Sequence, residues 1–420
     1  MIILKLLVAF SLFILALSKS ILIIYDDQIN SIENFDKLIN LLDSKSYDIS
    51  LRSTSNSLPA SFSFNEKKYD NLLFLTTLND ELTSDLSPLA LVEQLNQQGN
   101  LIICSDEDIS SLFRNFAREF SIEIDDQKLY QFDKSNLISV DKKYFNYPFN
   151  NVECNNQPLL YDGHSHHYPI TQPNDLRFPI INAPPGSFNS DTDFTSVEYG
   201  KGDYNKLVTA LQTTKNSRVV WVGSVKLFDD ENLNENSCNE AFISKLIDWT
   251  YQSSDVLNVT SINHTKIHKD GQEEHKPLEY VYNDTSKFEI GISVKQGDNW
   301  QPFITNDLQL EFTMLDPYIR TTLTPSRLSE DGKSMIYTKV FTIPDRHGIF
   351  KFVINYKRHG LSYIDEQIRT TVVPVRHDEH PRFLNYALPF YTGSISTIVC
   401  FVIFSIIWIN WNEKIEKKKE

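Results

Sequence analysis

The sequence predicts an α/β Rossmann-like N-terminal domain, a C-terminal antiparallel β-sandwich domain and one C-terminal transmembrane helix. In the first half, short continuous apolar runs alternate with segments of helical apolar spacing, as in parallel sheets covered by helices. After residue 255 the apolar period becomes two, which is typical of antiparallel strands. Residues 383–412 carry no charge. We therefore expect five segments: a signal peptide (1–18), the α/β domain with an irregular β insert (19–255), the β-sandwich (256–382), the transmembrane region (383–412) and a cytosolic tail (413–420).

The N-terminus has the pattern of a secretory signal. Lys5 precedes an apolar run at 6–17, and the small residues within 16–18 fit cleavage before Lys19. The alternative is an uncleaved membrane helix, but the run is short for one, and the next apolar run, at 21–25, is typical of a strand. The mature chain is expected to begin on the lumenal side of a membrane.

Regular elements of the α/β domain follow from hydrophobic periodicity. Buried strands are predicted at 21–25, 47–51, 72–76, 101–104 and 218–222. Helices are predicted at 32–42, 88–95, 110–120 and 241–251. The segment 125–214 is rich in Asn, Asp and Tyr and is expected to form irregular β structure.

The second domain is predicted to consist of antiparallel strands. They are expected at 288–294, 308–312, 337–341, 350–356 and 367–373. The preceding stretch, 256–277, is rich in Lys, His and Glu and is interpreted as the linker between the domains. Pro317 should mark a strand end, where Asp316 accepts hydrogen bonds from the backbone or from Arg320.

Three Asn-x-Thr tripeptides are candidate N-glycosylation sites. They begin at Asn258, Asn263 and Asn283, within or close to the predicted linker. The short spacing between the first two leaves open whether both are used.

The transmembrane prediction rests on length and composition. Residues 388–409 would form a helix of roughly 33 Å, enough to cross a hydrocarbon core of about 30 Å. Twelve of these residues are Leu, Ile, Val or Phe, so insertion into lipid is favourable. Trp408 and Trp411 fit an aromatic belt, and the lysine excess of the tail fits a cytosolic C-terminus.

The tail and the span each carry a candidate signal. Lys417 and Lys418 match the di-lysine address that returns membrane proteins to the endoplasmic reticulum, with a solvated basic tail as the alternative. Within the span, small residues recur at helical spacing and form one stripe that could pack against another helix, unless the stripe is chance composition. The stripe comprises Gly393, Ser396, Thr397 and Cys400.

Composition excludes some functions and leaves few catalytic candidates. A formal charge of −15 would repel nucleic acid. The histidines of the Gly-His-Ser-His-His run lack further ligands at metal spacing and are expected in an exposed loop. Asp191 and Asp193 are typical of an ordinary polar turn, and Cys104 lacks the glycines of a nucleophile elbow. Cys104, Cys154 and Cys238 allow one disulfide, whose pairing the sequence does not reveal. No cofactor motif is found.

Three runs in the second half are specific enough to suggest a family. They read FTMLDPYIR at 312–320, DRHGIFKF at 345–352 and VRHDEHPRF at 375–383. Together with YDNL at 69–72 and LIDWTY at 246–251, these runs resemble the family of 48-kilodalton subunits of the eukaryotic oligosaccharyltransferase. The resemblance covers nearly the whole mature chain and is weakest over 128–199.

This resemblance implies a single-pass, non-catalytic subunit of the complex that transfers an oligosaccharide from dolichyl diphosphate to asparagine in nascent proteins. In that family the catalytic residues belong to a polytopic subunit with a Trp-Trp-Asp-Tyr-Gly motif, which this sequence lacks. Implied partners are that catalytic subunit, ribophorin-like subunits, the small defender-against-death subunit and membrane lipid. Two other hypotheses remain: a lumenal cargo or chaperone receptor with the same topology, and an autonomous lumenal hydrolase or glycosyltransferase.

Overall fold

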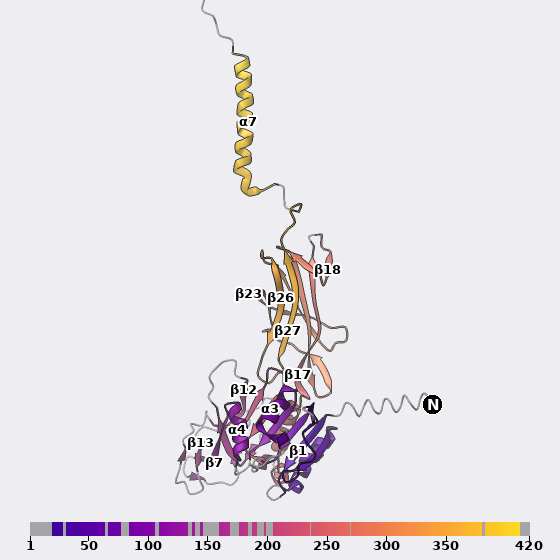
Figure 1. Cartoon of the computed structure of the whole chain (residues 1–420), viewed down its shortest axis with the longest axis vertical. Helices are drawn as coiled ribbons and strands as arrows, with labels where there is room; N and C mark the ends of the chain where they lie inside the picture. Colours follow the sequence, from indigo (N-terminus) through magenta and orange to yellow (C-terminus); the bar gives the residue numbers. More distant parts are fainter. Residues whose placement is uncertain are drawn as a thin grey trace, which may run out of the picture.

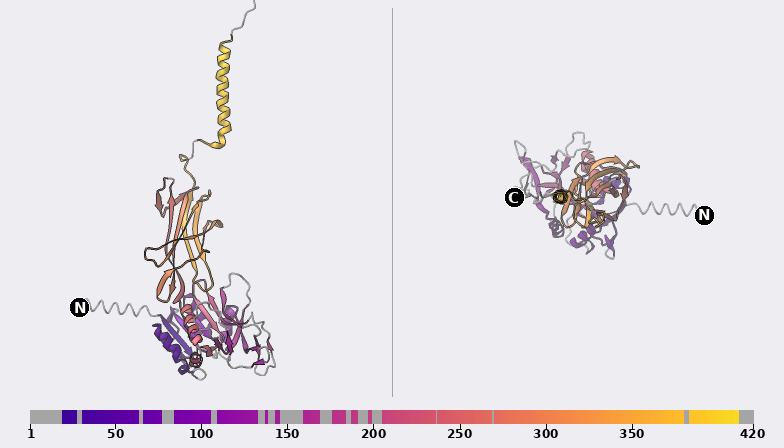
Figure 2. Two further views of the ribbon diagram at one scale, coloured as in Figure 1. Left: turned by 180° about the vertical axis from the view of Figure 1, so that it is seen from behind. Right: turned by 90° about the horizontal axis from the view of Figure 1, so that it is seen from above.

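The chain is elongated, with an α/β part, a β domain and a single long helix following one another along its long axis (Figures 1 and 2). The computed structural model describes residues 19–27, 31–63, 66–76, 84–105, 109–132, 137–138, 143–145, 159–168, 176–183, 187–190, 197–198, 205–235, 237–268, 270–379 and 383–411. The predicted signal peptide, Cys154, Asp191, Asp193 and the tail lysines lie outside these residues.

The α/β part contains five neighbouring parallel strands in the order β2-β1-β5-β6-β16. Their bounds are β1 Ser20–Tyr25, β2 Asp48–Ser53, β5 Asn71–Phe74, β6 Asn100–Cys104 and β16 Arg218–Val222. The helices of this part are η1 Ile32–Phe35, α2 Asp36–Ser44, η2 Ser84–Leu86, α3 Pro88–Asn96, α4 Ser111–Glu119, η3 Val225–Phe228, α5 Asp230–Glu235 and α6 Ser237–Thr250. Every predicted strand and helix of this part is present within a few residues of its expected position.

Two hydrophobic cores lie on the two faces of these strands, which explains the continuous apolar runs. Ile21 and Ile23 of β1 belong to the core that α2 and α6 cover, whereas Leu22 and Ile24 belong to the core under α3 and α4. Because successive side chains of a strand point to opposite faces, burial of both faces requires an apolar residue at every position.

An antiparallel extension continues the sheet beyond β16 through β15, β11, β7, β13 and β14. The strands between α4 and β16 are β7 Glu123–Phe132, β8 Leu137–Ile138, β9 Lys143–Phe145, β10 Leu159–Tyr161, β11 His164–His167, β12 Arg177–Asn182, β13 Ser187–Ser190, β14 Val197–Glu198 and β15 Lys206–Gln212. A small hairpin, β3 Phe62–Ser63 and β4 Glu66–Lys67, lies apart from this sheet.

The β domain consists of two sheets packed over one hydrophobic core. One sheet contains β17 Ser254–Ile267, β18 Glu273–His275, β20 Thr285–Gln296, β21 Asn299–Pro302, β24 Thr324–Leu328 and β25 Met335–Thr342. The other contains β19 Glu279–Val281, β22 Gln309–Thr313, β23 Pro317–Thr322, β26 Gly348–Tyr356 and β27 Ile364–Val373. The domain is not wholly antiparallel, because β19 pairs with β27 in parallel.

One prediction for this domain is wrong, and another is confirmed in part. The expected linker at 256–277 is largely strand β17, which pairs with β20 from Ser254 to Ile267. Its polar residues misled the prediction, because much of the strand faces solvent. Pro317 begins β23, as predicted, and Asp316 O accepts a backbone hydrogen bond from Met314 at 3.3 Å. Arg320, however, donates to Glu311, its cross-strand neighbour, at 2.7 Å, and not to Asp316.

Helix α7, Leu388–Ile409, follows the short turn η4, Asn385–Ala387. The most apolar 18-residue stretch of Asn385–Ile409 has a mean hydropathy of 2.1, and none of this stretch is buried against the rest of the chain. An apolar helix with no protein covering it suits a membrane anchor.

Candidate functional site

Ligands of open α/β sheets usually bind outside the carboxyl ends of the parallel strands, so this edge is a candidate ligand site. The chain leaves β6 through Ser105 and β16 through Gly223 and Ser224. Ser105 links the ends of these two strands. The Ser105 amide donates to Val222 O at 2.8 Å, and the Ser105 carbonyl accepts from Val225 N at 2.9 Å.

The chain's own turn between β10 and β11 fills this part of the edge. His164 donates its amide hydrogen to Gly223 O at 2.8 Å, and the buried Tyr161 hydroxyl donates to His164 O at 2.6 Å. A Cβ atom at Gly223 would lie 2.2 Å from His164 O, and one at Gly163 would lie 2.4 Å from Gly223 O. This contact leaves no room for a substrate above β16.

Charges next to this turn are paired. Lys226 lies 3.0 Å from Asp162, and the Ser224 hydroxyl donates to Asp162 O. Burial, with a smaller effect of Asp162, raises the pKa of Tyr161 well above its ordinary value. The Tyr161 hydroxyl therefore stays protonated and acts as a donor at physiological pH.

The histidine run does not form the predicted exposed loop. His164 and His166 are buried in β11, and His166 Nε2 lies 2.6 Å from Thr209 Oγ1 of β15. Only His167 faces outward, 3.0 Å from Glu123. Within the described residues, no group of three His, Cys, Asp or Glu side chains could hold a metal ion.

The cysteines differ in state. Cys104 ends β6 inside the core and is not disulfide-bonded, as expected of a core thiol. Cys238 of α6 is disulfide-bonded. Cys400 is an unbonded thiol on the exposed surface of α7.

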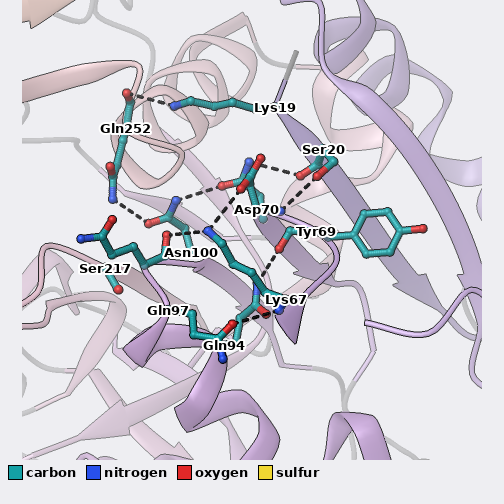
Figure 3. Close-up of polar contacts among 12 residues, drawn as sticks. Lys19, Ser20, Lys67, Tyr69, Asp70, Gln94, Gln97, Asn100, Ser217 and Gln252 are labelled. Carbon is teal, nitrogen blue, oxygen red and sulfur yellow. Dashed lines mark hydrogen bonds and ion pairs between the residues drawn. The ribbon is translucent and has the colours of Figure 1, made fainter. Parts of the chain in front are cut away.

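A polar network occupies the opposite edge, at the amino ends of the parallel strands (Figure 3). Asn100, the first residue of β6, donates to Asn71 Oδ1 of β5 at 2.9 Å and accepts from Gln252 Nε2 at 3.0 Å. Arg218 also donates its amide hydrogen to Asn100 Oδ1, at 3.1 Å. One asparagine thus joins three strands to the end of α6.

Lys19 closes the same edge. Its ammonium group donates to Tyr251 O and, at 3.2 Å, to Gln252 O at the carboxyl end of α6, where the helix dipole favours a cation. Burial, and secondarily Lys295, lowers the pKa of Lys19 to about 8. The Lys19 ammonium group has a structural role, because its N–H groups donate to backbone carbonyls.

Arg218 is the centre of the junction between the α/β part and the β domain. Its buried guanidinium donates to Trp249 O at 2.5 Å, Ser254 O at 2.9 Å and Asp255 O at 2.7 Å, and lies 4.6 Å from the Trp249 ring centre. Burial lowers its pKa to about 10, so it remains charged at neutral pH. This arginine fixes the path of the chain from α6 into β17.

Direct hydrogen bonds then join the β26–β27 turn to the α/β part. Asn216 donates to Tyr363 O at 3.0 Å and accepts from Tyr363 N at 2.6 Å. Gln212 Nε2 donates to Leu361 O at 2.9 Å, and Trp249 Nε1 donates to Gly360 O at 2.8 Å. Such directional contacts from both sides hold the two parts in one relative orientation.

An open cavity of about 520 Å³ lies beside this junction. Phe178 stacks on His359 at 5.1 Å and meets Trp249 edge-on at 5.6 Å, so these rings pack on each other in the cavity wall. Asp248, also in the wall, is paired with Lys45 at 2.5 Å.

The three candidate glycosylation sites lie in different settings. Asn258 is exposed in β17, and Asn283 is exposed in the turn before β20. Asn263 is half-buried, and the Thr265 hydroxyl of its tripeptide is buried 3.2 Å from His275 Nδ1.

The small-residue stripe of α7 is exposed along the helix. Ser396 donates to Gly393 O and Thr397 to Ser394 O, both at 2.8 Å, so these hydroxyls bond within their own helix. A Cβ atom at Gly393 would meet nothing within 4 Å.

Sequence reasoning did not find the junction residues Asn216, Arg218 and Trp249. Their partners are backbone carbonyl or amide groups far along the chain, and such pairing leaves no periodic pattern. The one available signal was Arg218 itself, a charged residue directly before a wholly apolar run.

Comparison with known proteins gives one family. A family model described as OST48, N-terminal domain, matches residues 13–253, and one described as OST48 middle domain matches residues 267–412. The dolichyl-diphosphooligosaccharide–protein glycosyltransferase subunit wbp1 of Schizosaccharomyces pombe is 28% identical, over 95% of this chain and 93% of that protein. The corresponding 48 kDa subunit of Arabidopsis thaliana is 25% identical, over 93% of this chain and 92% of that protein. A ThuA-like protein structure from Parabacteroides merdae, 13% identical, covers 49% of this chain and 78% of its own with a TM-score of 0.27, too low to support an argument.

Proposed function

This chain belongs to the OST48 family, and from that membership we propose that it is a non-catalytic, structural subunit of the endoplasmic reticulum oligosaccharyltransferase complex. Its role is to support assembly and stability of the complex that transfers the dolichyl-diphosphate-linked oligosaccharide to Asn-x-Ser/Thr sites. The names of the relatives, which are subunits of a dolichyl-diphosphooligosaccharide–protein glycosyltransferase, support this assignment.

One observation supports the non-catalytic part of the proposal. At the carboxyl edge of the sheet, the end of β16 is packed by the chain's own turn at Gly163 and Gly223. The polar groups of the opposite edge and of the junction are directed at one another and at backbone atoms of the same chain. Such groups orient domains and do not present a reactive atom to a ligand.

The proposed arrangement has two lumenal units, 19–255 and 256–382, on a single-pass type I anchor. The first unit is a Rossmann-like layer with an antiparallel extension, a description that the parallel order β2-β1-β5-β6-β16 supports. The span is α7, and the cytosolic tail carries Lys417 and Lys418 as the retrieval signal. The signal peptide 1–18 directs the chain into the endoplasmic reticulum.

Of the candidate glycosylation sites, Asn258 and Asn283 are the proposed acceptors. Both side chains are exposed, so each can carry a glycan in the folded chain. Asn263 is the poorer acceptor, because the Thr265 hydroxyl of its tripeptide is buried beside His275 of the neighbouring strand β18.

Proposed partners are the catalytic polytopic subunit, ribophorin-like subunits, the small defender-against-death subunit and membrane lipid. A tagged chain purified from a mild detergent extract should retain a fixed set of membrane subunits, and its depletion should leave many secreted proteins underglycosylated. Association with a changing set of secretory proteins would instead indicate a cargo or chaperone receptor. Purification without any membrane subunit would contradict the proposal.

A further inference from the structure

The chain continues to α7 from one end of the β domain (Figure 1), and exposed apolar side chains lie near that end. Leu315, in the turn between β22 and β23, is 92% exposed, and Ile349, at the start of β26, is 65% exposed. Leu278, directly before β19, is 91% exposed. None of these side chains supports the hydrophobic core of the domain.

The strand register puts these three residues at one height. Ile349 and Glu279, the neighbour of Leu278, both pair with Thr371, which lies two residues before the end of β27. The Leu315 turn reaches the same height, since a Cβ atom at Gly348 would lie 2.8 Å from the Met314 sulfur.

The membrane anchor is tethered to this same end. Residues 374–387 join β27 to α7, and part of this link is folded. Glu379 donates its amide hydrogen to Arg376 O at 3.0 Å, and η4 adds a second turn immediately before α7. These turns shorten the link between this end of the domain and the anchor.

Side chains suited to lipid headgroups flank the apolar residues. Tyr318 is 43% exposed and packs edge-on against Phe350 at 5.3 Å, and Arg346 is exposed as well. Tyrosine is enriched at the headgroup level of membranes, because its ring is apolar and its hydroxyl polar. Asp345 precedes Arg346 and Asp316 follows Leu315 in the sequence, so the surface does not select for anionic lipid.

We propose that this end of the β domain, the membrane-side tip, rests on the lumenal leaflet with Leu278, Leu315 and Ile349 inserted among the headgroups. Leu278 and Leu315 lie at opposite edges of the sheet β19-β27-β26-β22-β23. Four strand spacings, or about 19 Å, separate these edges. A protein partner needs a contiguous buried area, whereas separate apolar protrusions at one height fit a flat lipid surface.

Depth-dependent quenching in nanodiscs tests the membrane-side tip. The complex captured through this chain is reconstituted into phosphatidylcholine nanodiscs with and without brominated acyl chains. An environment-sensitive fluorophore is attached to Leu315→Cys, and separately to Ile349→Cys, each in a Cys400→Ser background. The matched control is Leu328→Cys, because Leu328 is 53% exposed and pairs with Met335 at the opposite end of the domain.

We expect brominated lipid to reduce emission from labels at 315 and 349 and to leave the label at 328 unchanged. The proposal would be overturned if brominated lipid left the emission of all three labels unchanged. It would also be overturned if the label at 315 were covered by another subunit and not quenched by brominated lipid. The inference rests on membrane anchoring by α7, so a label on the native Cys400 is included. If brominated lipid fails to quench the Cys400 label, membrane anchoring by α7 is contradicted. If it quenches the Cys400 label but not those at 315 and 349, only the proposal for the membrane-side tip is contradicted.

Discussion

Replacement of Arg218 by methionine tests whether the junction depends on one buried arginine. Methionine keeps most of the aliphatic packing but removes the guanidinium that donates to the carbonyls of Trp249, Ser254 and Asp255. Three carbonyl groups would lose a charged donor in a position that is 0% exposed to solvent.

The expected magnitude follows from opposing contributions. Hydrogen bonds to a charged group are worth roughly 1.5–3 kcal/mol each, so three of them contribute on the order of 4–9 kcal/mol. The variant also removes the cost of burying a charge, which is several kcal/mol and which the lowered pKa of Arg218 reflects. We therefore expect a net destabilisation of about 3 kcal/mol.

Urea unfolding of the purified full chain in detergent, followed by tryptophan fluorescence, measures this change. Arg320→Met is the matched control: Arg320 is also an arginine on a strand, but its side chain is 58% exposed and pairs with Glu311 alone. The control should lose less than about 1 kcal/mol. Equal losses in the two variants would refute the role assigned to Arg218.

Three further predictions address other parts of the chain. Burial, and secondarily Lys276, lowers the pKa of His264 below its ordinary 6.5, so the unfolded chain takes up the proton first as pH falls. Stability of the β domain should therefore drop between about pH 7 and 5, and His264→Phe should flatten that slope in thermal unfolding curves. Gly223→Ala should prevent accumulation of folded protein, since the added methyl would lie 2.2 Å from a carbonyl oxygen, whereas Gly393→Ala should accumulate normally; protease resistance reports the difference. Gly393→Leu with Thr397→Leu should still insert but recover fewer partner subunits in mild detergent, and equal recovery would mean that assembly rests on the lumenal domains.

Much of the fold could be predicted from the sequence because its strongest signals are hydrophobic. The parallel strands are buried on both faces, and runs such as residues 101–104 and 218–222 have no other simple explanation. Strand β17 was missed for the converse reason. It is a partly exposed strand with Asn, Ser, Thr, His and Lys side chains, and its backbone pairing with β20 leaves no trace in its composition.

The site was less predictable because its contacts are long-range. The histidine run suggested an exposed loop, yet His166 is buried in β11, where it contacts Thr209, a residue distant in sequence. Gly163 and Gly223 are ordinary glycines in the sequence, and only the fold shows that each allows close approach to the other's segment. The junction depends on side chains that recognise backbone groups of the other domain, and a single sequence does not encode that pairing locally.

The central claim is that this chain is a necessary but non-catalytic part of a transferase complex. Glycan transfer from a dolichyl-diphosphate-linked donor to an Asn-x-Thr peptide should be measured side by side for the complex captured through this chain and for the full chain purified alone. We expect transfer by the captured complex and none by the chain alone. Turnover by the isolated chain, or an inactive captured complex, would contradict it.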